Sequence, residues 1–262
     1  MRRGIRLAIF DLGGTIVDKY SLTPFLSFKE TLGNHGIHVS TQDIVQDMGM
    51  SKYAHIQKIL NTHKSDWNKI YYRDPSSDDV DNVYNDFLKV QKEKTKSTMT
   101  ILPETKVVID ELQKSDIQIA VTTGFDQDTM ILVHEKLTNH GIHIPENLMI
   151  SSTCMDISGR PDPGIIHELT KRANISNNSQ AVKIDDTPVG IKEGIHAGCW
   201  TIGVCRWSVH MGIEEPSQMH AVDEYHDFRL QKLSRAYRIL KDAGAQYVVS
   251  DLYGVAELAR EL

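Results

Sequence analysis

The 262-residue sequence has few cysteines and few aromatic residues, and it lacks long apolar runs. Its three cysteines, Cys154, Cys199 and Cys205, include no C-x-x-C pair, so we expect reduced thiols in a cytoplasmic protein. No stretch approaches the roughly 18 consecutive apolar residues that a membrane span needs. The apolar run after the basic start, Leu7–Phe10, is too short for a signal peptide. These absences predict a soluble protein with no membrane partner.

An excess of positive charge is also missing. Lysine and arginine number 29 against 35 aspartates and glutamates, which gives a net charge of −6. This balance excludes a dedicated polycation for nucleic acid and disfavours binding to anionic membrane surfaces. Hydrophobic residues make up 40% of the chain, as in ordinary globular proteins, and the length fits one large or two modest domains.

Short apolar runs alternate with helix-length segments over most of the sequence. Such alternation is typical of an α/β protein with a parallel sheet covered by helices on both faces. In such sheets, functional groups collect at the carboxyl ends of the strands. The predicted strands are 5–10, 117–121, 148–150, 181–184, 200–204 and 247–249, and the predicted helices are 104–114, 126–139, 163–173, 191–197, 223–242 and 252–262.

The segment from residue 20 to 98 differs from the rest because it has several helix signals and no convincing strand. Ser40 lies at capping-box spacing from Asp43, and 51–61 carries a helical apolar pattern. A turn at 74–77 precedes a long helical pattern. We therefore predict an all-helical cap, 21–97, inserted after the first strand of a core formed by 1–20 and 98–262.

Carboxylates follow two of the predicted strands. Asp11 begins the sequence Asp-Leu-Gly-Gly-Thr, where it is placed to act as a nucleophile or a metal ligand, or merely as a cap in a tight turn. Asp185 and Asp186 are adjacent, so they repel each other unless a cation or hydrogen bonds compensate. Mg²⁺ suits such oxygen ligands, although one aspartate could instead cap the following helix.

Two further positions offer groups that bind anions. Thr123 and Gly124 follow the second predicted strand, where a hydroxyl and a backbone N–H can hold a phosphoryl oxygen. Arg160, fixed between a glycine and a proline, can balance phosphoryl charge. Taken alone, the first pattern equally fits an ordinary loop, and the second fits a surface arginine.

Together these residues resemble the haloacid dehalogenase superfamily of phosphotransferases. Asp11, Thr123, Arg160 and Asp186 match its four motifs in order. The resemblance implies a Rossmann-like core with a helical cap inserted after the first motif, which is where the sequence pattern predicts the insertion. It also implies an aspartyl nucleophile at Asp11 and Mg²⁺ held by Asp11, Asp186 and the backbone carbonyl of Gly13.

One departure from that superfamily narrows the choice of branch. Its typical phosphatases carry a second aspartate that protonates the leaving group, and this sequence has Gly13 there. The cap segment offers Lys52, three residues before His55 and on the same helix face. A lysine in a partly apolar pocket has a lowered pKa and can form a Schiff base with an aldehyde. A solvated surface lysine is the ordinary alternative.

The missing acid and the stretch Met-Gly-x-x-Lys-x-x-His, from Met48 to His55, are similar to the phosphonoacetaldehyde hydrolase (phosphonatase) branch. This resemblance implies hydrolysis of a C–P bond through a Schiff base on Lys52 and an aspartyl phosphate on Asp11. His55 would orient the imine or relay protons. A small phosphonate as substrate and a homodimer formed through the caps are implied as well.

The resemblance also assigns the groups around the substrate. Arg160, Thr123 and the N–H of Gly124 would stabilise charge on the transferring group, and Met48, Phe125 and Ser21 would line the substrate pocket.

Several positions depart from the usual pattern of this branch. Asp185 stands where a glycine is usual and Gly190 where a later acid is usual, so we expect Asp185 to replace part of the missing charge at the metal. Ser21 replaces a cysteine, and Phe125 replaces a tyrosine. Two alternatives stay open: a Mg²⁺-dependent hydrolase of another phosphonate or phosphate ester, and a catalytically weak member with a binding role.

Overall fold

The computed structural model describes residues 4–153 and 158–262. Within these residues six strands form one parallel sheet in the order β3-β2-β1-β4-β5-β6. This confirms the predicted α/β class, and each predicted strand overlaps an observed one. The strands are β1 (Leu7–Phe10), β2 (Gln118–Thr123), β3 (Met149–Ser151), β4 (Ala181–Asp185), β5 (Trp200–Val204) and β6 (Tyr247–Val249).

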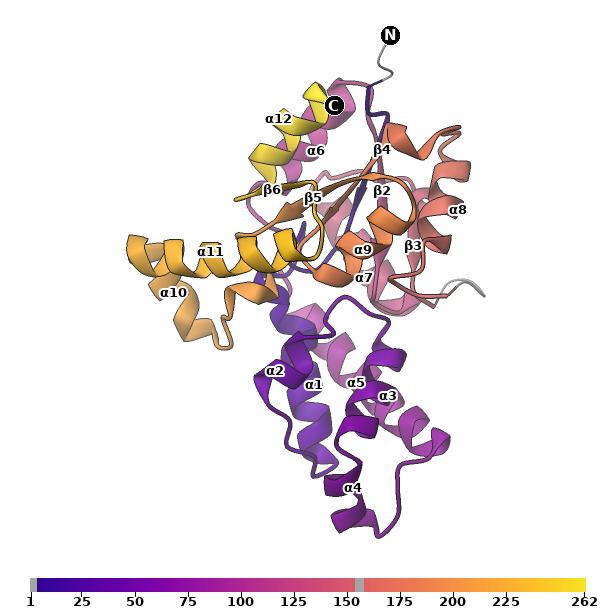
Figure 1. The fold of residues 1–262 in the computed structure, drawn as a ribbon, viewed down its shortest axis with the longest axis vertical. Coiled ribbons are helices and arrows are strands. Elements are labelled where there is room, and N and C mark those ends of the chain that lie inside the picture. Colours follow the sequence, from indigo (N-terminus) through magenta and orange to yellow (C-terminus); the bar gives the residue numbers. More distant parts are fainter. Residues whose placement is uncertain (1–3, 154–157) are drawn as a thin grey trace.

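Helices cover both faces of this sheet (Figure 1). Side chains of β1 alternate between the two faces, as in any strand. Ala8 and Phe10 pack with α6 (Thr105–Lys114), α7 (Gln127–Asn139) and α12 (Leu252–Glu261). Leu7 and Ile9 pack on the other face with α8 (Gly164–Arg172). The helix α9 (Pro188–His196) follows β4 directly and packs against β4 and β5.

Five α-helices lie between β1 and α6 and form a separate group below the sheet in Figure 1, which we call the helical insertion (residues 22–97). No residue from 22 to 97, all of which the structure describes, lies in a strand. The predicted capping box between Ser40 and Asp43 is present at α2. The helices are α1 (Leu22–Asn34), α2 (Thr41–Val45), α3 (Lys52–Thr62), α4 (Lys64–Tyr71) and α5 (Ser77–Ser97).

Two paired chain segments join the helical insertion to the sheet. Asp18 donates its backbone N–H to the carbonyl of Thr100 at 2.7 Å, so the outgoing and returning segments are hydrogen-bonded. Asp18, Tyr20 and Ser21 have φ values of 59°, 62° and 49°, a left-handed conformation that costs side-chain-bearing residues free energy. The donation from the Tyr20 N–H to the carbonyl of Trp207, at 2.7 Å, helps to hold this turn.

The segment between β5 and β6 contains two helices where the sequence pattern predicts one over 223–242. They are α10 (Pro216–Glu224) and α11 (His226–Asp242), separated by Tyr225, whose backbone is extended.

Cys199 and Cys205 are buried free thiols, and Cys154 lies outside the described residues. Among the described helices, none is long and apolar enough to cross a membrane. Short 3-10 helices are η1 (Lys19–Ser21), η2 (Glu146–Leu148), η3 (Asn178–Gln180) and η4 (Val209–Met211).

Candidate active site

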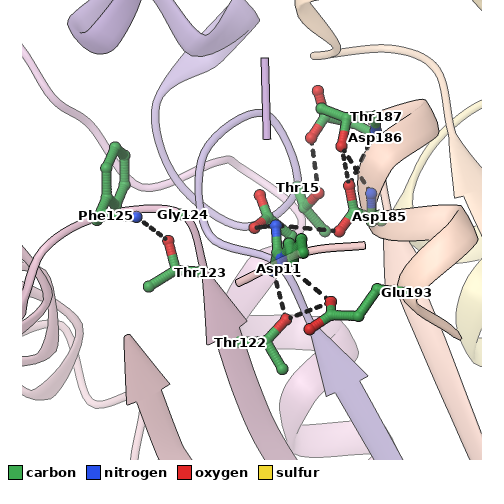
Figure 2. Close-up of polar contacts among 12 residues, drawn as sticks. Asp11, Thr15, Thr122, Thr123, Gly124, Phe125, Asp185, Asp186, Thr187 and Glu193 are labelled. Atoms are coloured by element: carbon green, nitrogen blue, oxygen red, sulfur yellow. Dashed lines mark hydrogen bonds and ion pairs between the residues drawn. The ribbon is translucent and has the colours of Figure 1, made fainter. Parts of the chain in front are cut away.

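Three carboxylates meet at the carboxyl ends of β1 and β4, which are neighbouring strands. Asp11, Asp185 and Asp186 each offer an oxygen, and these oxygens all lie within 4.8 Å of one another. The hydroxyl of Thr15 donates to Asp186 Oδ1 at 3.1 Å (Figure 2). All three carboxylates are buried. The structure therefore brings together the acids that the sequence places at two separate strand ends.

The three carboxylates differ in how strongly they hold a proton. Burial, with repulsion from Asp185 and Asp11, raises the pKa of Asp186 well above its ordinary value. Burial also raises the pKa of Asp11, against the attraction of Arg160. Asp185 is equally buried, but Lys183 and Arg160 outweigh the burial and lower its pKa. The cluster thus holds more negative charge than its surroundings neutralise.

Two buried cations lie beneath the carboxylates. Arg160 donates from Nη1 to Asp11 Oδ1 at 2.7 Å, and its Nε lies 2.9 Å from Glu193 Oε2. Lys183 Nζ lies 3.0 Å from Asp185 Oδ2 and 3.5 Å from Glu193 Oε2. Arg160 is 3% exposed and so is not a surface arginine. The sequence analysis does not identify Lys183 and Glu193, although a lysine inside an apolar strand is an available signal.

The charge balance of this cluster fits a divalent cation. If all four buried carboxylates are ionised, they exceed the two buried cations by two negative charges, and a divalent cation would balance this excess. Oxygen-only ligands of this kind suit Mg²⁺. The capping alternative for the two adjacent aspartates is wrong, because the Thr187 side chain caps α9 by accepting from Gly190 N. The carboxylates are those of Asp11, Asp185, Asp186 and Glu193, and the cations are Arg160 and Lys183.

A small pocket opens above Asp11, between the sheet and the helical insertion. Its free volume is about 20 Å³, little more than one water molecule needs. Eight of the residues that the sequence analysis assigns to the site line this pocket: Asp11, Gly13, Ser21, Met48, Lys52, Thr123, Gly124 and Phe125, joined by Pro24, Gly49 and Thr187.

Lys52, the first residue of α3, enters the pocket from the helical insertion and is only 4% exposed. Its Nζ lies 3.9 Å from the Met48 sulfur and 5.5 Å from the centre of the Phe125 ring. Burial lowers its pKa to about 8, against the attraction of Asp11. The ordinary alternative, a solvated surface lysine, is therefore wrong, and about one tenth of the amine is uncharged at pH 7, far more than for a lysine with the ordinary pKa.

His55 lies one turn along α3 from Lys52 but is not among the described residues that line the pocket. Its ring packs on Phe28, with centroids 4.3 Å apart. Burial, together with the charges of Lys52 and Lys58, lowers its pKa to about 3, so its imidazole is neutral. The structure thus places His55 in the core of the helical insertion, behind the lysine.

The two threonines at the end of β2 face different surroundings. Thr123 lines the pocket, and its hydroxyl accepts from the Phe125 N–H at 3.1 Å. Thr122 instead accepts from Lys183 Nζ at 2.7 Å and donates to Glu193 at 3.1 Å, as Figure 2 shows for the latter bond. Thr122 therefore belongs to the buried charge cluster, a role that the sequence analysis does not assign.

Comparison with known proteins gives the family of this chain. A family model described as haloacid dehalogenase-like hydrolase matches residues 8–204. The chain belongs to the haloacid dehalogenase-like hydrolase family. Phosphonoacetaldehyde hydrolase from Paraburkholderia xenovorans (strain LB400) is 30% identical over 251 residues, covering 95% of this chain and 91% of that protein. The enzyme of that name from Latilactobacillus sakei subsp. sakei (strain 23K) is 32% identical over 250 residues, with 95% and 92% covered. Within the family, the chain falls in the phosphonoacetaldehyde hydrolase branch.

A solved structure gives the same result for the fold. The crystal structure of a phosphonoacetaldehyde hydrolase like protein from Oleispira antarctica superposes with a TM-score of 0.91, at 24% identity, over 98% of this chain and 92% of that one. The sheet and the helical insertion of this hydrolase therefore follow an arrangement already observed in crystals.

Residue 13 is a glycine, and two side chains limit the space that a larger residue could occupy there. A Cβ atom added to Gly13 would lie 3.4 Å from Phe125 Cζ and 3.5 Å from Ser21 Oγ. The space in which a longer acid at residue 13 would extend is thus bounded by these two side chains. Ser21 and Phe125 therefore both lie next to residue 13, which offers no acid.

Proposed function

We propose that the protein hydrolyses the C–P bond of phosphonoacetaldehyde to give acetaldehyde and phosphate. One observation carries the proposal: a buried lysine, Lys52, and a buried aspartate, Asp11, line the same small pocket, and Gly13, which lines it too, offers no acid. A phosphatase that releases an alkoxide needs an acid to protonate it, whereas an imine accepts the electrons of the breaking bond without one.

The proposed steps begin at Lys52. Its uncharged amine adds to the aldehyde, and the adduct takes up a proton from solvent and loses water to form an iminium ion. An oxygen of Asp11 then attacks phosphorus, and the electron pair of the C–P bond moves toward the iminium nitrogen to give an enamine. Water hydrolyses the aspartyl phosphate, which releases phosphate. The enamine takes a proton at carbon, and hydrolysis of the resulting imine releases acetaldehyde and restores Lys52.

Residues around Asp11 would stabilise the negative charge on the phosphoryl group as it transfers. Arg160 holds Asp11 Oδ1 at 2.7 Å and so orients the nucleophile, while Thr123 and the N–H of Gly124 line the pocket where the phosphonate would bind. When bound by Asp11, Asp186 and the carbonyl of Gly13, with Asp185 nearby, Mg²⁺ supplies positive charge that offsets repulsion between carboxylate and phosphonate. His55, packed on Phe28 one turn along α3 from Lys52, would help to fix the helix that carries the lysine.

A coupled assay for acetaldehyde tests the proposal directly. Purified protein should release acetaldehyde and phosphate in equal amounts from phosphonoacetaldehyde, and chelation of Mg²⁺ should abolish the release. Absence of acetaldehyde at saturating substrate and Mg²⁺ would contradict the proposal. Release of phosphate from another phosphonate or a phosphate ester, but not from this one, would favour the related hydrolase instead.

Reductive trapping tests the part played by Lys52. Borohydride added with phosphonoacetaldehyde should inactivate the enzyme and add a two-carbon phosphonate or ethyl group to Lys52, identified by peptide mass spectrometry. Lys52→Arg should prevent both effects. Lys58→Arg is the matched control, because Lys58 lies on the same helix, is 54% exposed and pairs with Asp47 at 2.6 Å.

A homodimer formed through the helical insertions is the second part of the proposal. Ile70, Tyr71 and Tyr72, at the end of α4, are 42%, 38% and 88% exposed. Apolar residues gathered at one exposed tip are typical of an interface. Light scattering should give twice the mass of the chain, and Tyr72→Ser with Ile70→Ser should give the monomer mass.

A further inference from the structure

Thr122 and Lys183 lie on the same face of the sheet, on the two strands that flank β1. Ile9 on β1 is in register with Ala120 on β2 and with Lys183 on β4. Because side chains alternate along a strand, Thr122 shares the face of Ala120, two residues before it. Asp11, two residues after Ile9, lies between these two neighbouring strands. The pairing of the strands therefore brings a hydroxyl and an amine together beside the proposed nucleophile.

The hydroxyl of Thr122 is hydrogen-bonded on all sides by buried charged groups. It accepts from Lys183 Nζ at 2.7 Å and also from Arg160 Nη2. Neither cation can accept a hydrogen bond, so the hydroxyl proton is left for Glu193 Oε2, at 3.1 Å. Figure 2 shows Thr122 and Glu193 facing each other next to Asp11. The charges around this threonine therefore fix the direction of each of its hydrogen bonds.

The guanidinium of Arg160 is held at three of its nitrogen atoms. Nη2 donates to the Thr122 hydroxyl, and Nε lies 2.9 Å from Glu193 Oε2. Nη1 donates to Asp11 Oδ1 at 2.7 Å and lies 3.5 Å from Asp185 Oδ2. A guanidinium is planar and rigid, so contacts at Nε and Nη2 determine where Nη1 points.

We propose that Thr122 and Glu193 are positioning residues, which fix the Arg160 guanidinium so that its Nη1 holds Asp11 in the orientation for attack on phosphorus. Among the described residues, neither of the two lines the pocket, so they act through Arg160 and not on the substrate. The part of this inference that concerns attack by Asp11 rests on the proposed function. The part that concerns the position of the arginine does not.

Thr122→Val tests the inference, because valine has nearly the shape of threonine and the exchange changes no charge near the proposed metal site. The kcat for acetaldehyde release should fall about tenfold to a hundredfold, as expected when a nucleophile is misplaced by up to about 1 Å, while KM stays within about twofold. Thr122→Ser keeps the hydroxyl and should restore most of kcat. Glu193→Gln should lower kcat as Thr122→Val does, and if it does not fold, the threonine variants decide alone.

Thr31→Val is the matched control. Thr31 is also buried, but its hydroxyl has no hydrogen-bond partner among the described residues. Its replacement removes no bond, so kcat and the melting temperature should both stay at the wild-type values.

The Nε–H proton of Arg160 reports on the guanidinium in the absence of substrate. Its NMR signal, assigned by its loss in Arg160→Lys, should exchange slowly with solvent in the wild type, in Thr122→Ser and in Thr31→Val. In Thr122→Val and Glu193→Gln the exchange should be at least about tenfold faster, because a side chain with fewer contacts opens to solvent more often.

Two results would overturn the inference: an unchanged exchange rate of the Arg160 proton in Thr122→Val, or a wild-type kcat in that variant despite faster exchange. Failure of the proposed function looks different. If the wild type releases no acetaldehyde, the reaction is wrong, and the exchange rates still decide whether Thr122 and Glu193 fix the arginine.

Discussion

Arg160 and Asp11 form a buried ion pair, with Nη1 2.7 Å from Oδ1 and side chains 1% and 8% exposed. The same guanidinium lies 2.9 Å from Glu193 at its Nε. Burial disfavours the charged arginine, but Glu193, Asp11 and Asp185 outweigh this and raise its pKa. One side chain thus neutralises the proposed nucleophile and supports the carboxylates behind it, so its loss affects stability as well as chemistry.

Arg160→Ala should lower the free energy of unfolding by about 3–5 kcal/mol, because it leaves buried carboxylates unpaired. Urea unfolding followed by circular dichroism measures this loss. Lys106→Ala is the control, since Lys106 pairs with Asp110 at 2.9 Å on the surface and should cost at most about 1 kcal/mol. Equal losses for the two variants would show that the buried network does not depend on Arg160.

Lys52→Met should stabilise the protein at neutral pH, by up to about 3 kcal/mol, because it removes a buried amine whose pKa is lowered from 10.5 to about 8. Between these pH values the unfolded state binds a proton that the folded state does not, so the free energy of unfolding of the wild type should rise with pH. The advantage of Lys52→Met should therefore shrink from pH 8 to pH 10.5. Urea unfolding at pH 7 and pH 10 checks this, with Lys58→Met as the exposed control. A constant difference would contradict the lowered pKa.

Gly124→Ala should disturb the contact between the helical insertion and the sheet. A Cβ there would lie 2.5 Å from the carbonyl oxygen of Met50, whereas a Cβ on Gly159 would lie 3.5 Å from Ser51 Cβ, an ordinary contact. We expect Gly124→Ala to expose Lys52 and move its pKa toward 10.5, and Gly159→Ala to leave it near 8. The pH dependence of the labelling rate of Lys52 by an amine reagent measures both values. The same pH profile for the two variants would show that this contact does not control burial of the lysine.

Gly13→Asp should not create a phosphatase. The added carboxylate would meet Phe125 and Ser21 and would add a negative charge beside three buried carboxylates. We expect activity on phosphonoacetaldehyde to fall at least about tenfold and no activity to appear on p-nitrophenyl phosphate. Gly13→Ala, whose Cβ fits at 3.4 Å, should fold with a nearly unchanged melting temperature. Efficient hydrolysis of the ester by Gly13→Asp would show that the missing acid alone selects the reaction.

The positions of the strands and of the helical segment along the chain could be predicted because they depend on local patterns, whereas the order of the strands in the sheet comes from the structure. Apolar runs predicted every strand, and the Ser40 capping box predicted α2. The predicted helix 223–242 corresponds to α11, and the break at Tyr225 was missed because the sequence has no glycine or proline there to mark it. The resemblance placed Asp11, Lys52 and Asp186 in one site, and the structure brings Asp11 and Lys52 into one pocket with Asp186 beside Asp11.

The sequence by itself determined the fold class, the positions of the acids at strand ends and the absence of an acid at Gly13, since each depends on residue type and spacing. Only the tertiary structure decided which charges are buried together. Lys183 and Glu193 are ordinary residues in the sequence, yet the packing of α9 on β4 removes them from water and pairs them with Arg160 and Asp185. Burial likewise decides the state of Lys52, because the pKa of a lysine depends on its surroundings and not on its neighbours along the chain.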